Sequence, residues 1–188
     1  MNRDKRGKVE LFGYEQLIMP MEEELVIGGG PDAAGYARKW HGRFLDMADT
    51  IAGWSKDPST KVGCVIIDSD TRAILSMGYN GFPRGVEDRA EWYEDREYKY
   101  PVVVHAEINA IVTSTTRLTG ATLYCNIGLP CPDCAGPIIQ AGISKVVCPT
   151  GTRTILNTSF FNKLTLQMFE DAGIELVEID DWEPKANE

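Results

Sequence analysis

The chain has 188 residues, of which 43% are hydrophobic, and it carries 19 lysines and arginines against 28 aspartates and glutamates, a formal net charge of −9. A chain of this size can bury one sizeable core. The net negative charge, with no basic cluster beyond the first eight residues, argues against a protein that binds the phosphate backbone of a nucleic acid. No long apolar run follows the charged N-terminus, so we expect neither secretion nor membrane insertion and a location in the cytosol, that of the host cell if the source is viral.

The first 35 residues are expected to form an arm or linker. They mix charged residues with an acidic run at 22–24 and a glycine-rich stretch at 28–31. The triple glycine lacks the preceding strand and the Lys-Ser/Thr pair of a phosphate-binding loop, so it is not interpreted as a nucleotide site. One domain is expected over 36–182, followed by a short tail at 183–188.

Hydrophobic periodicity predicts the first elements of this domain. Apolar residues recur at helical spacing from Tyr36 to Ile51, and Gly53 ends this amphipathic helix. A hairpin of two strands joined by a polar turn is expected at 62–67, 68–71 and 73–79. Residues 84–99, which are rich in charged and aromatic side chains, are expected to form a loop.

Alternating helices and strands are predicted for the rest of the domain. A strand ending at Val104 leads into a helix, and a second strand, turn and helix occupy 123–140. A strand at 144–148, a helix over 164–173 and a closing strand at 174–179 complete the series. A hairpin followed by this alternation predicts an α/β fold with a mixed sheet flanked by helices.

Two short motifs carry the chemistry. His105 and Glu107 lie in the first turn of one predicted helix, and Cys131 and Cys134 lie at the start of the next. One imidazole and two thiolates can hold Zn²⁺ tetrahedrally and leave the fourth position for water. Helix N-termini favour thiolates, and the His-x-Glu and Pro-Cys-x-x-Cys pair is typical of zinc-dependent nucleobase deaminases. We therefore predict one catalytic zinc per chain.

Zinc lowers the pKa of its bound water to roughly 7, which makes hydroxide available at neutral pH. This hydroxide suits an attack on C4 of a cytosine ring. Glu107, which binds no metal, would take the proton from the water, pass it to ring N3 and then protonate the departing amine. Ammonia would leave and uracil would remain.

These residue types also have other roles in proteins. A C-x-x-C pair can be a redox dithiol or half of a structural zinc site, and a lone histidine is more often a core or surface residue than a ligand. The sequence has no second C-x-x-C and no H-x₃₋₅-H pair to complete a closed site, and His41 is the only other histidine, so a second zinc is not expected. The other cysteines lie in strand-like runs and are expected to be small buried hydrophobic groups: Cys64, Cys125 and Cys148.

Four longer sequence segments, beyond the two short motifs, are informative: 56–63, 78–83, 100–111 and 130–135. In order and spacing they resemble the deoxycytidylate (dCMP) deaminases of the zinc-dependent cytidine and deoxycytidylate deaminase family, from about Trp40 to about Val147. The resemblance implies a three-layer α/β/α cytidine-deaminase-like sandwich with a mixed sheet. It also implies hydrolysis of dCMP to dUMP and ammonia, which supplies dUMP for thymidylate synthesis.

The resemblance implies contacts with the substrate. Asn80 would hydrogen-bond the sugar 3′-OH, although turn chemistry is an alternative role for an asparagine between glycine-rich neighbours. Ser55, Lys56 and Lys61, which lie before the first predicted strand, are expected near the 5′-phosphate, with Lys56 as the first choice and a solvated surface charge as the alternative. Ala106 is placed among the substrate-binding residues.

Regulation is also implied by the resemblance. Members of the family are typically homohexamers that dCTP activates and dTTP inhibits. We expect the glycine-rich loop with Gly81, Phe82 and Arg84 to hold such a nucleoside triphosphate, accompanied by Mg²⁺.

Two further functions remain open. The protein could deaminate another cytosine compound, such as a C5-substituted dCMP, a nucleoside or RNA. It could also be a catalytically silent, zinc-stabilised module that binds nucleotides, but Glu107 argues against this because a structural zinc site needs no carboxylate proton carrier. Ammonia release across a panel of cytosine compounds separates these functions.

Overall fold

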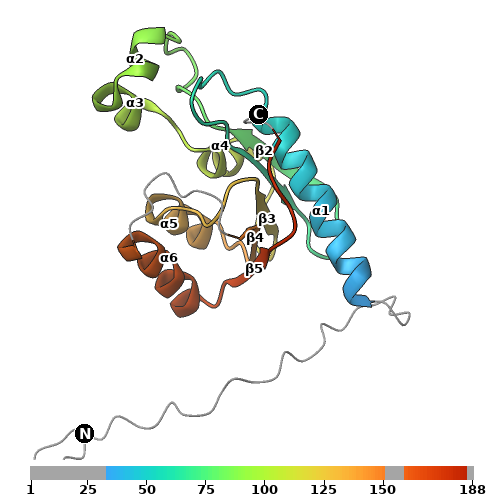
Figure 1. Cartoon of the computed structure of the whole chain (residues 1–188). Helices are drawn as coiled ribbons and strands as arrows, with labels where there is room; N and C mark the ends of the chain where they lie inside the picture. The colour runs from blue at the N-terminus through green and yellow to red at the C-terminus, as the bar shows by residue number, and fades with distance from the viewer. Residues whose placement is uncertain (1–32, 151–158, 186–188) are drawn as a thin grey trace, which may run out of the picture. The chain divides into compact units, whose positions relative to one another are not determined.

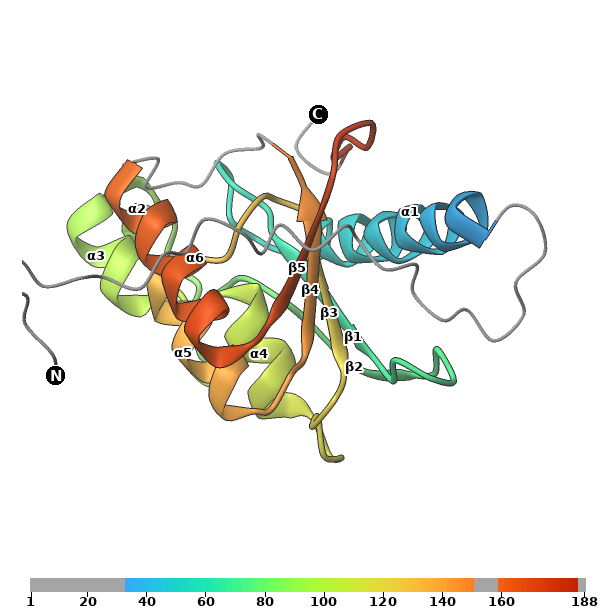
Figure 2. The ribbon, with the colours of Figure 1, turned by 90° about the horizontal axis from the view of Figure 1, so that it is seen from below.

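A five-stranded mixed sheet with the strand order β2-β1-β3-β4-β5 organises the fold (Figures 1 and 2). The computed structural model describes residues 33–150 and 159–185. β1 runs antiparallel to β2 and β3, whereas β3, β4 and β5 run parallel to one another. The strands are β1 (Gly63–Ile67), β2 (Ile74–Tyr79), β3 (Thr122–Cys125), β4 (Lys145–Pro149) and β5 (Glu175–Ile179).

Helices cover both faces of the sheet. α1 lies on one face, and α4, α5 and α6 lie on the other, so the fold is the predicted three-layer α/β/α sandwich (Figure 2). The helices are α1 (Ala33–Ala52), α2 (Ala90–Glu94), α3 (Arg96–Val102), α4 (Ala106–Thr113), α5 (Pro132–Gln140) and α6 (Ser159–Ala172). Within the described residues, no helix is long and apolar enough to cross a bilayer.

The chain divides into two units, Met1–Ala37 and Arg38–Glu188. Of the first unit, the structure describes only 33–37, which begin α1; all the other elements belong to the second. Of the predicted arm at 1–35 the structure describes only 33–35, and of the predicted tail at 183–188 only 183–185.

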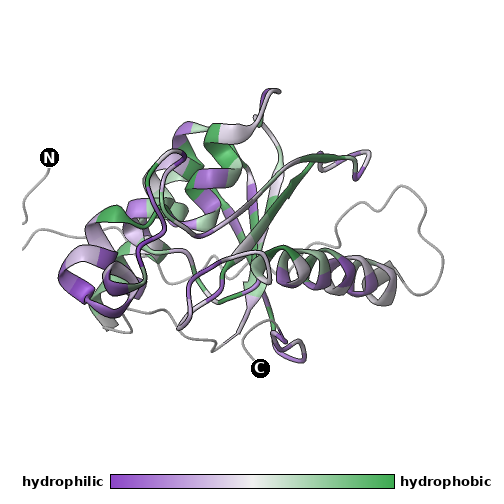
Figure 3. Cartoon of the chain, turned by 90° about the horizontal axis from the view of Figure 1, so that it is seen from above, coloured by the Kyte–Doolittle hydropathy of each residue, from purple (hydrophilic) through white to green (hydrophobic). Residues whose placement is uncertain are grey.

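Side chains of the strands alternate between two hydrophobic cores. Cys64 and Ile66 of β1 face the core shared with α4 and α5, whereas Val65 and Ile67 face α1. All five residues of β1 are buried, as expected for a strand that is covered on both faces. Along α1, hydrophilic and hydrophobic residues alternate with the helical period (Figure 3). The predicted burial of Cys64, Cys125 and Cys148 is confirmed.

Two glycines allow helices to approach the sheet closely. A Cβ at Gly63 would lie 1.8 Å from the carbonyl oxygen of Ala48 in α1. A Cβ at Gly78 would lie 2.4 Å from the backbone nitrogen of Ala110 in α4. Ser76 reinforces the second contact, since its Oγ donates to the carbonyl oxygen of Ala110 at 2.6 Å. α4, which carries the predicted catalytic residues, is therefore seated directly against β2.

The prediction of a loop over 84–99 was wrong, because this segment contains α2 and most of α3. Both helices are short and mix charged with aromatic side chains, so hydrophobic periodicity does not reveal them. α3 is nevertheless well capped: the side chain of Asp95 accepts a hydrogen bond from the backbone nitrogen of Glu97 at 2.9 Å. Val104, predicted to end a strand, forms only an isolated bridge with Gly81.

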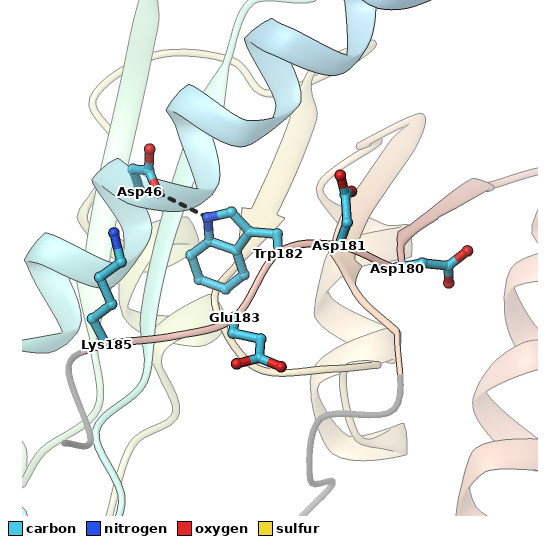
Figure 4. Close-up of a pocket in the computed structure, with 6 residues that line it drawn as sticks. All are labelled: Asp46, Asp180, Asp181, Trp182, Glu183 and Lys185. Carbon is cyan, nitrogen blue, oxygen red and sulfur yellow. Dashed lines mark hydrogen bonds between the residues drawn. The ribbon is translucent and has the colours of Figure 1, made fainter.

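The segment after β5 lies along α1. The indole Nε1 of Trp182 donates to Asp46 Oδ1 at 2.8 Å (Figure 4), and the backbone nitrogen of Lys185 donates to Asp49 Oδ2 at 2.9 Å. A hollow of about 350 Å³ there is lined by Asp46, Asp180, Asp181, Trp182, Glu183 and Lys185. None of these is a predicted site residue.

Candidate active site

His105, Cys131 and Cys134 come together in the structure, with one potential ligand atom from each lying within 4.8 Å of the others. Nδ1 of His105 lies 3.2 Å from Sγ of Cys134 and 3.4 Å from Sγ of Cys131. Tetrahedral zinc with ordinary bond lengths separates its nitrogen and sulfur ligands by about 3.5 Å. The donor set and its spacing therefore fit Zn²⁺. Within 33–150 and 159–185, this is the one cluster of histidine, cysteine and acidic side chains that could hold a metal.

Two helix N-termini deliver these ligands. His105 is the N-cap of α4, with φ −70 and ψ 154, and Cys131 is the N-cap of α5, with φ −69 and ψ 164. Pro132 begins α5, where its fixed φ suits the first helical position and its missing N–H is not needed. Cys134 lies three residues after Cys131, in the first turn of α5, so the two cysteines are neighbours in space.

Hydrogen bonds within the cluster shift the acidities of its members. The hydrogen bond with Cys134, assisted by that with His105, lowers the pKa of Cys131 to about 4 despite burial. The hydrogen bond with Cys131 raises the pKa of His105 to about 9, and the same thiolate together with burial raises the pKa of Cys134. Zinc takes a neutral imidazole and two thiolates, so binding the ion would release the protons of His105 and Cys134.

Glu107 lies two residues beyond His105, in the first turn of α4, and is only 5% exposed. Burial raises its pKa, and the charge of His105 opposes this shift only in part. Its Oε1 lies 3.9 Å from Sγ of Cys125, a buried thiol of β3. A buried carboxyl group with a raised pKa can exchange protons near neutral pH more readily than an ordinary glutamate.

The predicted substrate residues form two separate sets of contacts. Ser55 Oγ donates to the carbonyl oxygen of Asn80 at 2.8 Å, and both side chains are buried. Lys56 instead lies on the surface, where its Nζ is paired with Asp88 Oδ2 at 2.5 Å. Ala106, the first residue of α4, is fully buried.

Both polar atoms of the Asn80 side-chain amide form hydrogen bonds with the backbone. Its Oδ1 accepts from the backbone nitrogen of Val62 at 2.8 Å, and its Nδ2 donates to the carbonyl oxygen of Thr60 at 2.9 Å. Nδ2 also lies 3.4 Å from Asp57 Oδ2. Asn80 thus shapes the loop before β1, whatever it contacts in a ligand.

The predicted effector residues begin directly beside the ligand cluster. Gly81 exchanges two backbone hydrogen bonds with Val104, at 3.1 and 2.9 Å, immediately before His105. Phe82 stacks on Tyr93 of α2 with ring centroids 4.2 Å apart. Arg84 is exposed.

One buried ion pair, Asp57 with Lys99, is not among the predicted site residues. Asp57 stands in a run, Asp-Pro-Ser-Thr, that favours a side-chain-bonded turn, and this signal could have drawn attention to it. Lys99 has no such signal, because a buried lysine differs from a surface lysine only in its three-dimensional surroundings.

Comparison with known proteins agrees with this geometry. The family model of the cytidine and deoxycytidylate deaminase zinc-binding region matches residues 38–150. The chain belongs to this family. The match covers nearly the same stretch as the resemblance inferred from the motifs, and that inference is confirmed.

Two relatives and one solved structure illustrate the similarity. A protein of Aliivibrio fischeri named "uncharacterized deaminase in luxG 3′ region" is 44% identical over 140 residues, which are 73% of this chain and 92% of that protein. Human deoxycytidylate deaminase is 40% identical over 115 residues, which are 58% of this chain and 64% of that enzyme. The apo crystal structure of dCMP deaminase from cyanophage S-TIM5 is 26% identical with a TM-score of 0.58, and the alignment covers 75% of this chain and 98% of that one. The chain thus spans most of the bacterial and phage proteins but less than two thirds of the human enzyme.

Proposed function

We propose that the protein hydrolyses dCMP to dUMP and ammonia and so supplies dUMP for thymidylate synthesis. The observation that carries the proposal is the placement of Glu107, which is buried in the first turn of α4, two residues from His105, and is hydrogen-bonded to the side chain of Cys134. The names of the relatives support dCMP as the substrate. So does a second S-TIM5 structure, described as a complex with dCMP and dUMP, which is 25% identical with a TM-score of 0.53 and is covered over 99% of its length.

In this mechanism His105, Cys131 and Cys134 hold zinc, and Glu107 moves protons. Zinc, when bound, lowers the pKa of a water molecule to about 7 and makes it a nucleophile for C4 of cytosine. The Glu107 carboxylate accepts a proton from this water and gives it to N3 of the ring, which makes C4 more electrophilic. Glu107, again a carboxylate, then takes the second proton from the hydroxyl group on C4 and gives it to the amine as the bond from C4 to nitrogen breaks. Glu107 ends the cycle as a carboxylate.

Asn80, Ser55, Lys56 and Ala106 are proposed to bind the nucleotide. A side-chain amide oxygen has two lone pairs, and Val62 occupies one of those on Asn80 Oδ1, so a second lone pair can accept from the sugar 3′-OH. Lys56 would exchange Asp88 for the 5′-phosphate. An exposed ion pair such as Lys56–Asp88 contributes little, and a dianionic phosphate can compete for the ammonium group.

Regulation and assembly are proposed from the family resemblance. The loop with Gly81, Phe82 and Arg84 would bind dCTP or dTTP together with Mg²⁺, in a cytosolic homohexamer. The pairing of Gly81 with Val104 supports this choice of segment, because it provides a direct backbone connection to His105. The domain proposed for catalysis is 36–182, with 1–35 as an arm.

Ammonia release from a panel of cytosine compounds tests the proposed function. The panel contains dCMP, deoxycytidine, CMP, a C5-substituted dCMP and a single-stranded oligonucleotide, each with and without dCTP or dTTP. We expect dCMP to have the highest kcat/KM and the oligonucleotide to be inert, because the acidic surface repels a polyanion. Equal use of deoxycytidine and dCMP would contradict the nucleotide assignment, and bound zinc without any ammonia release would contradict catalysis.

A further inference from the structure

The ion pair between Asp57 and Lys99 is buried and joins two segments that are distant in sequence. Asp57 lies in the loop between α1 and β1, and Lys99 lies on α3. Lys99 Nζ lies 2.7 Å from Asp57 Oδ2 and 2.8 Å from Oδ1. The side chains of Lys99 and Asp57 are 11% and 1% exposed. The pair is therefore shielded from solvent and salt.

Asp57 organises the loop around its own carboxylate. Oδ1 accepts from the backbone nitrogens of Ser59 and Thr60 at 2.9 and 3.1 Å, and from Ser59 Oγ at 3.0 Å. Lys99 also donates to Ser59 Oγ at 2.6 Å. Burial tends to raise the pKa of Asp57, but the donors from Lys99, Ser59 and Thr60 outweigh it and hold the pKa below its ordinary value. The carboxylate is charged at neutral pH.

The same loop supports Asn80. The carbonyl oxygen of Thr60 and the backbone nitrogen of Val62 hold the two ends of the Asn80 amide, and Oδ2 of Asp57 lies 3.4 Å from its nitrogen. Ser55 Oγ holds the backbone carbonyl of Asn80. A shift of Asp57 would therefore be transmitted to Asn80 through Thr60 and Val62.

At the other end of the ion pair, Lys99 belongs to the segment that leads to His105 in the ligand cluster. The carbonyl oxygen of Lys99 accepts from the backbone nitrogen of Val103 at 2.9 Å and ends α3. Val104 then pairs with Gly81, and His105 follows. Asp57 and Lys99 thus connect the loop that holds Asn80 with the segment that delivers His105.

Stability alone does not account for such a pair. Replacing a buried ion pair with neutral groups of similar volume is often neutral or stabilising, whereas removing one partner is strongly destabilising because a buried charge is left alone. What a neutral replacement loses is the fixed geometry of several charge-assisted hydrogen bonds that converge on one carboxylate.

We propose that Asp57 and Lys99 are a positioning pair that fixes the substrate-binding loop, 55–61, against α3 and thereby sets the place of Asn80 relative to His105. The inference rests on the proposed function for the identity of the substrate. The structural part of it, the placement of Asn80 by the pair, is independent of the substrate.

The double variant Asp57→Asn/Lys99→Met separates positioning from stability. We expect it to unfold close to the temperature of the unmodified protein and to bind one zinc per chain, but to show a KM for dCMP raised at least about tenfold, with kcat changed less than KM. Lys99→Met alone, which leaves the Asp57 charge buried, should unfold at a clearly lower temperature. Lys145→Met is the matched control, since it removes a half-buried ion pair with Glu175 at 3.2 Å between β4 and β5, and its KM should not change.

Asp57→Glu provides a second variant should the double variant fail to fold. It keeps the charge for Lys99 but moves the carboxylate outward by one methylene, so KM should again rise. An unchanged KM in either folded variant would overturn the positioning role.

Amide hydrogen exchange tests, without any substrate, whether the pair of Asp57 and Lys99 places Asn80. Ser59 and Thr60 are bonded to Asp57 directly, so their amides would respond to any change there. The amide of Val62 is bonded to Asn80 instead, and faster exchange of Val62 in a folded variant is expected only if the pair places Asn80. Unchanged Val62 exchange would overturn the inference. Absence of dCMP turnover in the unmodified protein would contradict the proposed function alone.

Discussion

Asn80 Oδ1 accepts a hydrogen bond from the backbone nitrogen of Val62 at 2.8 Å and so ties the end of β2 to the beginning of β1. The two strands are already paired, with Gly63 opposite Tyr79, and the side-chain bond extends this pairing into the loops. An asparagine that was predicted to contact the ligand thus also closes the loop before β1. Its two roles are compatible, but they make Asn80 a position where stability and activity change together.

Asn80→Asp is expected to destabilise the fold by at least about 2 kcal/mol, because the change removes the buried donor to Thr60 and places a second carboxylate beside Asp57. Repulsion between the two carboxylates raises their pKa values. The loss relative to the unmodified protein should therefore shrink as the pH falls and one of them becomes protonated. Denaturant unfolding at several pH values measures this. Asn109→Asp, at a less buried hydrogen bond to Tyr79, should cost less than about 1 kcal/mol, and an equal cost at both positions would contradict the buried network.

Glu107→Gln is expected to lower kcat at least about 100-fold, because it keeps the shape of the side chain and removes the proton carrier. One residue serves several proton transfers, so the loss should exceed this lower limit. Zinc should remain bound, and metal analysis alongside ammonia release checks both points. Glu94→Gln, at an exposed glutamate of α2, serves as the control. Near-normal turnover of Glu107→Gln would show that the proposed mechanism is wrong.

The metal content should be one zinc per chain. Cys131→Ala removes one of three protein ligands and is expected to lose both zinc and activity, whereas Cys148→Ala, in the buried strand β4, should keep both. Dialysis against a chelator, followed by metal analysis and addition of zinc, should abolish and restore ammonia release. Two stoichiometric zinc ions, or an active enzyme without metal, would contradict the predicted ligand set.

Because Asp57 is ionised in the folded protein, the free energy of unfolding should fall more steeply with decreasing pH than in a variant that lacks this carboxylate. Its pKa in the folded protein is lowered below the ordinary value of about 3.9. The stabilisation from ionised Asp57 is therefore present above this ordinary value and is lost as the pH falls through the lower value of the folded state. Thermal unfolding between about pH 6 and pH 2.5 should show a smaller acid dependence for Asp57→Asn/Lys99→Met than for the unmodified protein. Parallel pH profiles would contradict the lowered pKa.

Gly63→Ala is expected to be among the most damaging small substitutions, at the upper end of the roughly 1–3 kcal/mol that overpacking costs. The new Cβ would lie 1.8 Å from the Ala48 carbonyl oxygen, and backbone atoms of α1 cannot move aside alone. Gly136→Ala in α5 is the matched control: its Cβ would meet nothing within 4 Å, and alanine favours a helix over glycine by about 0.5–1 kcal/mol. Denaturant unfolding should thus show a lower free energy of unfolding for Gly63→Ala and a higher one for Gly136→Ala than for the unmodified protein.

The sequence predicted the ligand cluster well because the cluster depends on local geometry. A histidine and a C-x-x-C pair at helix starts need only the order of strands and helices to meet, and hydrophobic periodicity supplies that order. α2 and α3, with five and seven residues, are too short to show a hydrophobic period. The pair of Asp57 with Lys99, 42 positions apart, depends on where α3 packs, which no local pattern encodes.

The proposed phosphate contact yields the most selective prediction. Lys56→Ala should raise KM for dCMP about threefold to tenfold, a modest effect because the lysine is exposed and solvent screens its charge. KM for deoxycytidine, which has no phosphate, should change much less, so the preference for the nucleotide narrows. Lys39→Ala, at an exposed lysine of α1, should leave both values unchanged. If Lys56→Ala raises both KM values equally, the side chain acts on the loop through Asp88 rather than on the phosphate, and if neither rises, Lys56 is a solvated surface charge.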